Sequence, residues 1–247
     1  MHGIPLTDTQ QREREGRRGE YQRRHSHGPL SRPVLAHVLC LLVITTVSSA
    51  DVWPSDRRGY DNHLIPILGV TFEHERPEGQ VVQLLLGFGQ RQDATGLEVV
   101  FPRGPGQLSP MAQTSVEQAI RRAAHHAGLS TDSWSVRLVV PYPHVTVYGS
   151  SLSAMVALSV LALAKGNEIP SDRVLTGGIT PDGRIECVGA VPLKIQGAMR
   201  AHMRRILIPD EADPADEEWR TPFLVQVSPV HSVEEAYLAL TGHALSP

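Results

Sequence analysis

The 247-residue chain is long enough for one or two globular domains, and its composition, 41% hydrophobic and 20% charged, is ordinary for a folded protein. The chain has 23 basic and 26 acidic residues, and the first 50 positions contain 7 of the basic and 4 of the acidic ones. The remaining residues therefore include 16 basic and 22 acidic side chains, a net charge of −6. A mildly acidic body lacks the concentrated basic patch that binds phosphate, which argues against a nucleic-acid partner.

The first 50 residues form two segments of different composition. Residues 1–32 are arginine-rich and are predicted to be a disordered basic arm. Residues 33–50 are an apolar run ending in Ser48-Ser49-Ala50, and the two segments together are typical of a secretory signal. Because the run is short for a membrane span, cleavage after Ala50 is favoured over a retained signal-anchor helix. Either alternative predicts that the residues after Ala50 are exported, and a retained anchor would also associate the protein with a membrane.

The rest of the chain divides into a polar linker at 51–64, one continuous domain at 65–242 and a short tail at 243–247. The pattern predicts an α+β (mixed α/β) fold of several short strands with packed helices. Strands are expected at 67–73, 81–88, 97–101, 135–140, 174–179, 185–188, 205–208 and 224–227. Helices are expected at 110–126, 153–164, 192–202 and 233–240.

Helix 153–164 differs from the other predicted helices in its composition. Its sequence, SAMVALSVLALA, is apolar nearly all round, which is typical of a helix buried on every side. It is too short to span a membrane. We therefore expect it to be the central element of the core.

Lysine is rare in this chain, and the position of one lysine suggests chemistry. Only Lys165 and Lys194 are lysines, whereas the other 21 basic residues are arginine. Arginine cannot release its proton in a protein, but a lysine in a dry setting can become a neutral amine and act as a general base. Lys194 lies 43 positions after Ser151, so the pair predicts the Ser/Lys form of hydrolytic catalysis.

Both candidate residues lie near predicted helix starts. Ser151 precedes helix 153–164, whose backbone N–H groups are expected to stabilise an oxyanion. Pro192 suits the first position of its helix, which puts Lys194 in the first turn. The helix dipole and burial both disfavour an ammonium there, so we expect a lowered pKa for Lys194. Thr176 is placed to hydrogen-bond the amine and hold it toward Ser151.

These segments resemble the proteolytic domain of the Lon family of Ser/Lys peptidases, over roughly residues 65–242. The register needs no gap between the serine and the lysine, and the strand at 205–209 is similar to the family's strand ending in Ile-Pro. The matching motifs are Gly149-Ser150-Ser151-Leu152-Ser153, Thr176-Gly177-Gly178-Ile179 and Val188-Gly189-Ala190-Val191-Pro192-Leu193-Lys194.

The resemblance implies a role for each matching residue and a kind of protein. It implies that Ser151 is the nucleophile, Lys194 its base and Thr176 the residue that steadies the lysine. It also implies a protein or peptide substrate and a ring-shaped homo-oligomer. No Gly-x-x-x-x-Gly-Lys-Ser/Thr loop occurs in the 247 residues, so the expectation is an ATP-independent serine endopeptidase without a cofactor, acting on unfolded or flexible proteins outside the cytoplasm.

The serine loop departs from the family pattern. Tyr148 and Ser150 stand where the family usually has an acid, Leu152 and Ser153 replace Ala-Gly, and Ala190 replaces a glycine. The alternative is therefore a weakly active or inactive Lon-like module used for protein binding or assembly.

Other candidate residues have simpler interpretations. Ser150 is a rival nucleophile, as is Ser153, but neither keeps the family spacing. Adjacent His125 and His126 point to different faces, so they are poor paired metal ligands. His144 is interpreted as a solvated loop residue in preference to a cleft residue. No Cys/His metal spacing is present.

Overall fold

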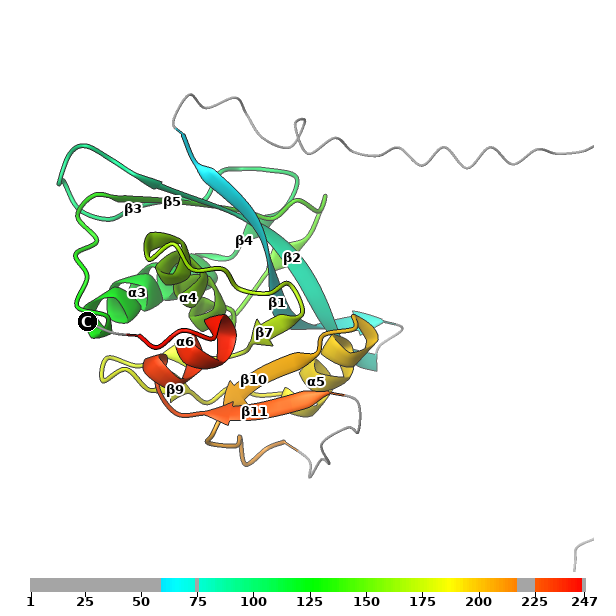
Figure 1. The fold of residues 1–247 in the computed structure, drawn as a ribbon. Helices are drawn as coiled ribbons and strands as arrows, with labels where there is room; N and C mark the ends of the chain where they lie inside the picture. The colour runs from blue at the N-terminus through cyan, green and yellow to red at the C-terminus, as the bar shows by residue number, and fades with distance from the viewer. Residues whose placement is uncertain (1–58, 74–75, 217–224, 246–247) are drawn as a thin grey trace, which may run out of the picture. The chain divides into compact units, whose positions relative to one another are not determined.

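The computed structural model describes residues 59–73, 76–216 and 225–245 (Figure 1). The predicted basic arm, the apolar segment at 33–50 and most of the linker lie outside the described residues. Within the three described ranges, no helix combines the length and apolar character needed to cross a membrane. The fold is α+β, as predicted.

The larger sheet has four strands in the order β1-β2-β5-β3. Strands β1 (Asp61–Glu73) and β2 (Arg76–Gln90) form a long antiparallel hairpin, in which Ile67 pairs with Val82. Strand β5 (Trp134–Val139) is antiparallel to β2 and parallel to β3 (Glu98–Val100). Among the described residues β1 therefore has one unpaired edge.

Strand β2 follows the period of two that predicts a half-buried strand. Leu84, Leu86 and Phe88 are buried, and the Phe88 ring packs edge-on against Trp134 of β5 with the ring centroids 5.6 Å apart. The buried face points toward the helices α3 (Pro110–His126) and α4 (Ser153–Ala164).

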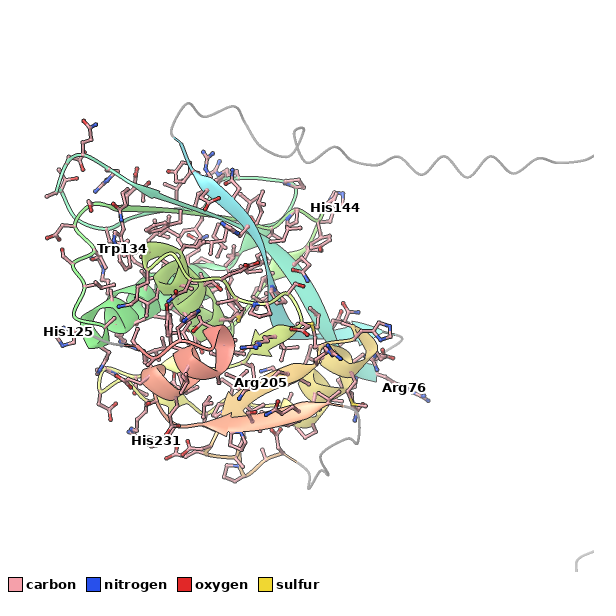
Figure 2. The ribbon with its side chains drawn as sticks, in the orientation of Figure 1. Arg76, His125, Trp134, His144, Arg205 and His231 are labelled. Carbon is pink, nitrogen blue, oxygen red and sulfur yellow. The ribbon has the colours of Figure 1, made fainter. Side chains whose placement is uncertain are left out.

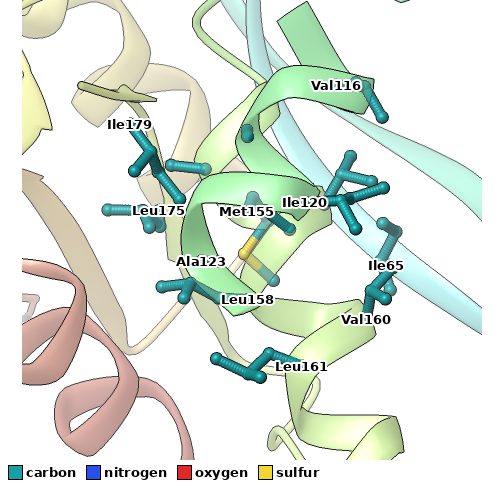
Figure 3. Close-up of a cluster of buried hydrophobic side chains, with 14 of the residues drawn as sticks. Ile65, Val116, Ile120, Ala123, Met155, Leu158, Val160, Leu161, Leu175 and Ile179 are labelled. Carbon is teal, nitrogen blue, oxygen red and sulfur yellow. The ribbon is translucent and has the colours of Figure 1, made fainter. Parts of the chain in front are cut away.

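Helices α3 and α4 have the bounds that the sequence predicts. Ser109 caps α3, its hydroxyl accepting a hydrogen bond of 3.2 Å from the Ala112 N–H, and Pro110 follows at the first helical position. Gly128, with φ of 65°, ends it in the left-handed conformation. Figure 3 shows Met155 and Leu158 of α4 surrounded by side chains from several other elements. The prediction of a helix buried on every side is confirmed.

A second, parallel sheet has the order β11-β10-β7. Helices α5 and α6 belong to this half, and α5 also packs on β2 (Figure 1). Arg173 and Arg205 both donate to the Ala239 carbonyl at the end of α6, which fixes this helix against the sheet. The bounds are β7 Arg173–Leu175, β10 Arg205–Pro209, β11 Gln226–Val230, α5 Val191–Arg200 and α6 Val233–Thr241.

Three features differ from the sequence prediction. Residues 61–64, assigned to the linker, are the first part of β1. The strand expected at 174–179 is split into β7 and β8 (Gly178–Ile179) at Gly177, whose φ of 153° suits glycine. An additional short pair forms between β4 (Gln107–Leu108) and β6 (Thr146–Val147), and the strand expected at 185–188 is the two-residue β9 (Ile185–Glu186), which pairs with β8. Pairs of two residues depend on tertiary contact and leave no periodic signal.

Candidate active site

One cavity of about 630 Å³ brings together the two residues that the sequence selects for catalysis. Ser151 and Lys194 both line it, although they come from different elements. One wall is the β1–β2 hairpin, with residues 67–71 and 80–82, and the opposite wall includes the segment 145–148. The size suits a few substrate side chains.

Ser151 lies in a turn two residues before α4 begins, and this turn is held from a distance. The Ser151 carbonyl accepts a hydrogen bond of 2.8 Å from the Gly177 N–H, and the Gly177 carbonyl accepts one of 3.1 Å from the Ala154 N–H. Leu152, at the N-cap, provides no side-chain cap. The β7–β8 turn therefore takes the place of a cap and fixes the serine loop.

Two of the N–H groups at the start of α4 are already engaged. The Ser153 N–H donates to the Ser150 carbonyl at 2.9 Å, and the Ala154 N–H is bound as described above. Across the described part of the chain, the N–H groups of Ser151 and Leu152 have no hydrogen-bonded acceptor. They are the backbone donors that an oxyanion on a substrate carbon bound at Ser151 would use.

Lys194 is the fourth residue of α5, and its N–H closes the first turn on the Ala190 carbonyl at 3.1 Å. Its side chain is only 5% exposed. Burial lowers the pKa of Lys194 to about 8, while the Asp216 carboxylate and Cys187 act in the opposite direction. The lowered pKa of Lys194 agrees in direction with the sequence prediction, and burial is its dominant cause.

Thr176 contacts the serine loop. It is fully buried, and its hydroxyl donates to the Ser151 carbonyl at 3.4 Å. The predicted hydrogen bond from Thr176 to the Lys194 amine is not found among the described residues. The strand is interrupted between Leu175 and Gly178, and in this interruption the Thr176 hydroxyl bonds to the serine loop.

Three residues that sequence reasoning passed over hold α5 in place. Gly79 of β2 touches the backbone of α5 so closely that a Cβ there would overlap the Leu193 carbonyl. Gly197 of α5 contacts the Gly79 backbone, and a Cβ at Gly197 would overlap it. A glycine inside a strand is a known sign of such close approach, so Gly79 offered a signal. The Asp216 carboxylate accepts hydrogen bonds from backbone N–H groups at the start of α5. The sequence gave no signal for this role, because Asp216 lies in an acidic loop without periodicity.

Part of the cavity lining is aromatic and apolar. Tyr148 lines the cavity and is 74% exposed, and Tyr142 and Val145 line it as well. The residue that stands where the family usually has an acid is thus an exposed aromatic side chain of the lining. The edge of an aromatic ring offers contact area for apolar groups without adding charge.

The histidines considered in the sequence come from two different parts of the fold. His125 is at the end of α3, whereas His144 lies in the loop directly before Val145 of the cavity lining (Figure 2). Neither is among the residues that line the cavity. Among the described residues, no group of three or more His, Cys, Asp or Glu side chains has metal-binding geometry.

A loop serine and a buried lysine of lowered pKa thus line one cavity of an α+β fold. The chain belongs to the family of Lon protease (S16) C-terminal proteolytic domains, whose model matches residues 105–235. The β1–β2 hairpin precedes this match, although it forms one wall of the cavity.

Curated relatives match about half of the chain. Lon protease 1 of Sorangium cellulosum (strain So ce56) is 30% identical over 139 residues, 53% of this chain and 17% of that protein. The Lon protease of Syntrophomonas wolfei subsp. wolfei is 28% identical over 131 residues, 48% of this chain and 16% of its own length. The archaeal Lon protease of Archaeoglobus fulgidus is 24% identical over 131 residues, 53% of this chain and 21% of that protein. The matched regions thus span about a fifth or less of these relatives.

Proposed function

We propose that this protein is a serine endopeptidase in which Ser151 is the nucleophile and Lys194 is the general base. The observation that carries the proposal is the burial of Lys194 in the cavity that Ser151 lines, with its pKa lowered to about 8. A structural lysine would ordinarily extend its amine into water, because desolvating a charge is unfavourable. Family membership supports the same chemistry.

The mechanism is acyl transfer to the serine. Neutral Lys194 accepts the Ser151 Oγ proton as Oγ attacks a peptide carbonyl, and the N–H groups near Ser151 bind the oxyanion. The lysine ammonium then donates the proton to the leaving amine. Water attacks the resulting ester while Lys194 accepts a proton from it, and the lysine ammonium returns this proton to the Ser151 Oγ as the acid product leaves. Thr176 and Gly177 keep the serine loop fixed through their bonds to the Ser151 carbonyl.

The substrate is proposed to be an unfolded or flexible polypeptide. Residues 67–71 of the edge strand β1 line the cavity, so an extended segment placed there finds unpaired backbone groups to bond. Most backbone groups of a folded protein are already paired within it, so an unfolded segment fits this strand more readily. The apolar lining at Leu68, Val70 and Val147 favours segments with apolar side chains.

We further propose that hydrolysis needs no ATP and occurs outside the cytoplasm. The first point is supported by the lack of a nucleotide-binding Gly-Lys-Ser/Thr loop within the 247 residues, and the second by the signal-like composition of residues 1–50. Association of the N-terminal segment with a membrane and assembly into a homo-oligomeric ring are parts of the same proposal. The ring rests on the family resemblance.

A second candidate function is a non-catalytic module that binds proteins. The observation in its favour is the changed serine loop, with exposed Tyr148 where the family usually has an acid. Such a module would bind unfolded protein without cleaving it.

We expect the full chain to cleave an unfolded protein without ATP, and Ser151→Ala to lower the rate at least roughly a thousandfold. Lys194→Arg should have a similar effect, since guanidinium cannot take up the serine proton. The measurement is the appearance of new amino termini in a permanently unfolded substrate, with Ser150→Ala as the matched control. Binding of the substrate without cleavage by the parent favours the binding module, and cleavage that survives Lys194→Arg contradicts the assignment of the base.

The rate of cleavage should rise with pH through a midpoint near 8. The base is active as the neutral amine, and the pKa of Lys194 is lowered to about 8, so about a tenth of the molecules are competent at pH 7 and most are at pH 9. We therefore expect kcat to increase about tenfold between these values. A kcat profile already flat from pH 6 to 9 would show that an ionisation other than that of Lys194 controls the rate.

A further inference from the structure

The start of α5 is capped by a side chain from a distant loop. One oxygen of the Asp216 carboxylate accepts from the Ala190 N–H at 2.7 Å, and the other accepts from the Val191 N–H at 2.9 Å. The residue at the N-cap itself, Ala190, has no side chain that can do so. A carboxylate that binds two N–H groups at once fixes both distance and orientation, and charge strengthens both bonds.

Ala190 needs such support because of its backbone. Its φ of 60° and ψ of 31° are in the left-handed region, which an alanine disfavours because its Cβ crowds the following carbonyl. The next three residues lead directly to Lys194, whose N–H bonds to the Ala190 carbonyl. Any relaxation of Ala190 would therefore rotate the turn that carries the lysine.

The loop that carries Asp216 is itself ordered. Asp213 accepts from the Ala215 N–H through its carboxylate at 2.9 Å and from the Asp216 N–H through its carbonyl at 3.0 Å. The loop also packs on Gly189, where a Cβ would lie 3.0 Å from the Asp213 carboxylate. Asp216 thus approaches α5 from a turn that is shaped to present it.

We propose that Asp216 is a positioning residue for Lys194, holding the first turn of α5 so that the amine faces Ser151 and placing a negative charge at that turn. This inference rests on the proposed function and goes further, because neither the motifs around the serine nor those around the lysine include Asp216. The Asp216 carboxylate favours the ammonium form, so it limits how far burial lowers the pKa of the lysine.

Few other charges act on the lysine. Cys187 is the second ionisable group that influences Lys194, and it also favours the ammonium. The residues of β1 and β2 that line the cavity are uncharged, and the β10 residues packed on α5 are apolar. The ion pair between Arg200 and Glu78 belongs to the opposite end of α5. Removing the charge of Asp216 should therefore lower the pKa of Lys194.

The test compares Asp216→Asn and Asp216→Ala in the full chain with Asp210→Asn as control, since Asp210 bonds to His231 and not to α5. We expect kcat to fall roughly tenfold in Asp216→Asn and roughly a hundredfold in Asp216→Ala, with KM nearly unchanged. The midpoint of the pH–rate profile should move to lower pH in Asp216→Asn, because loss of a nearby negative charge favours the neutral amine. Asp210→Asn should behave as the parent.

A second readout does not depend on activity. The chain has only two lysines, so NMR of protein labelled with ¹³C at the lysine Cε carbons gives two titrating signals, with Lys165 as internal reference. The Lys194 midpoint should fall by about half a pH unit or more in Asp216→Asn, with the Lys165 midpoint unchanged. An unchanged or raised Lys194 midpoint overturns the inference, as does a parent-like kcat in Asp216→Ala. If the parent lacks peptidase activity, the proposed function fails while the NMR titration still decides the placement of Asp216 beside the amine.

Discussion

Replacing Lys194 by methionine should make the protein more stable at pH 7 while abolishing peptidase activity. The pKa of Lys194 is lowered from 10.5 to about 8 by burial, a difference that corresponds to about 3 kcal/mol of penalty on the folded state when the amine is protonated. Methionine has similar volume and no charge to desolvate. We expect the free energy of unfolding to rise by up to about 3 kcal/mol.

The pH dependence of this gain has a definite sign. Between pH 8 and 10.5 the unfolded state holds more protons on Lys194 than the folded state, so the stability of the parent rises across this window. The advantage of the methionine variant should be full below pH 8 and nearly absent above pH 10.5. Urea denaturation of both proteins at pH 7 and pH 10.5 measures it.

The other lysine provides the matched control. Lys165 lies at the C-cap of α4, where a cation interacts favourably with the helix dipole. Lys165→Met should therefore lower stability slightly or leave it unchanged. A Lys194→Met protein that is less stable than the parent at pH 7 would contradict the assignment of Lys194 as a buried amine held for chemistry.

Replacing Gly79 by alanine should lower both stability and peptidase activity, because Gly79 packs against the backbone next to Lys194. A Cβ at this position would overlap the Leu193 carbonyl, so either β2 or the first turn of α5 must move. Forcing one extra methyl into such a contact destabilises proteins by about 1–3 kcal/mol, and a shift of about 1 Å in the base lowers kcat roughly a hundredfold. Thermal denaturation and the cleavage assay measure the two effects.

Gly69 supplies the comparison for stability. It lies on β1, the other strand of the same hairpin, and a Cβ there would meet no atom within 4 Å. Gly69→Ala should leave the free energy of unfolding unchanged or raise it slightly, because alanine restricts the unfolded chain. Equal stability and equal activity of Gly79→Ala and the parent would show that the hairpin and α5 are free to separate without consequence.

The prediction of elements succeeded where local signals were strong. Helix α3 has a serine cap, a proline at its first position and a glycine after its end, and its bounds agree with the sequence. Helix α4 has continuous apolar composition, which identified both its limits and its burial. Strand β8 was missed as a separate element because the break at Gly177 serves the serine loop, a partner far away in the sequence.

The α+β class, the buried helix and the choice of Ser151 and Lys194 could be predicted because each depends on composition, periodicity or a motif in a short stretch of chain. The folded chain was needed to learn that the two residues share one cavity, that Thr176 bonds to the serine loop, and that Asp216 caps the helix of the lysine. These facts depend on which backbones approach each other. A cap bound across 26 residues follows from the path of the whole chain and leaves no local pattern.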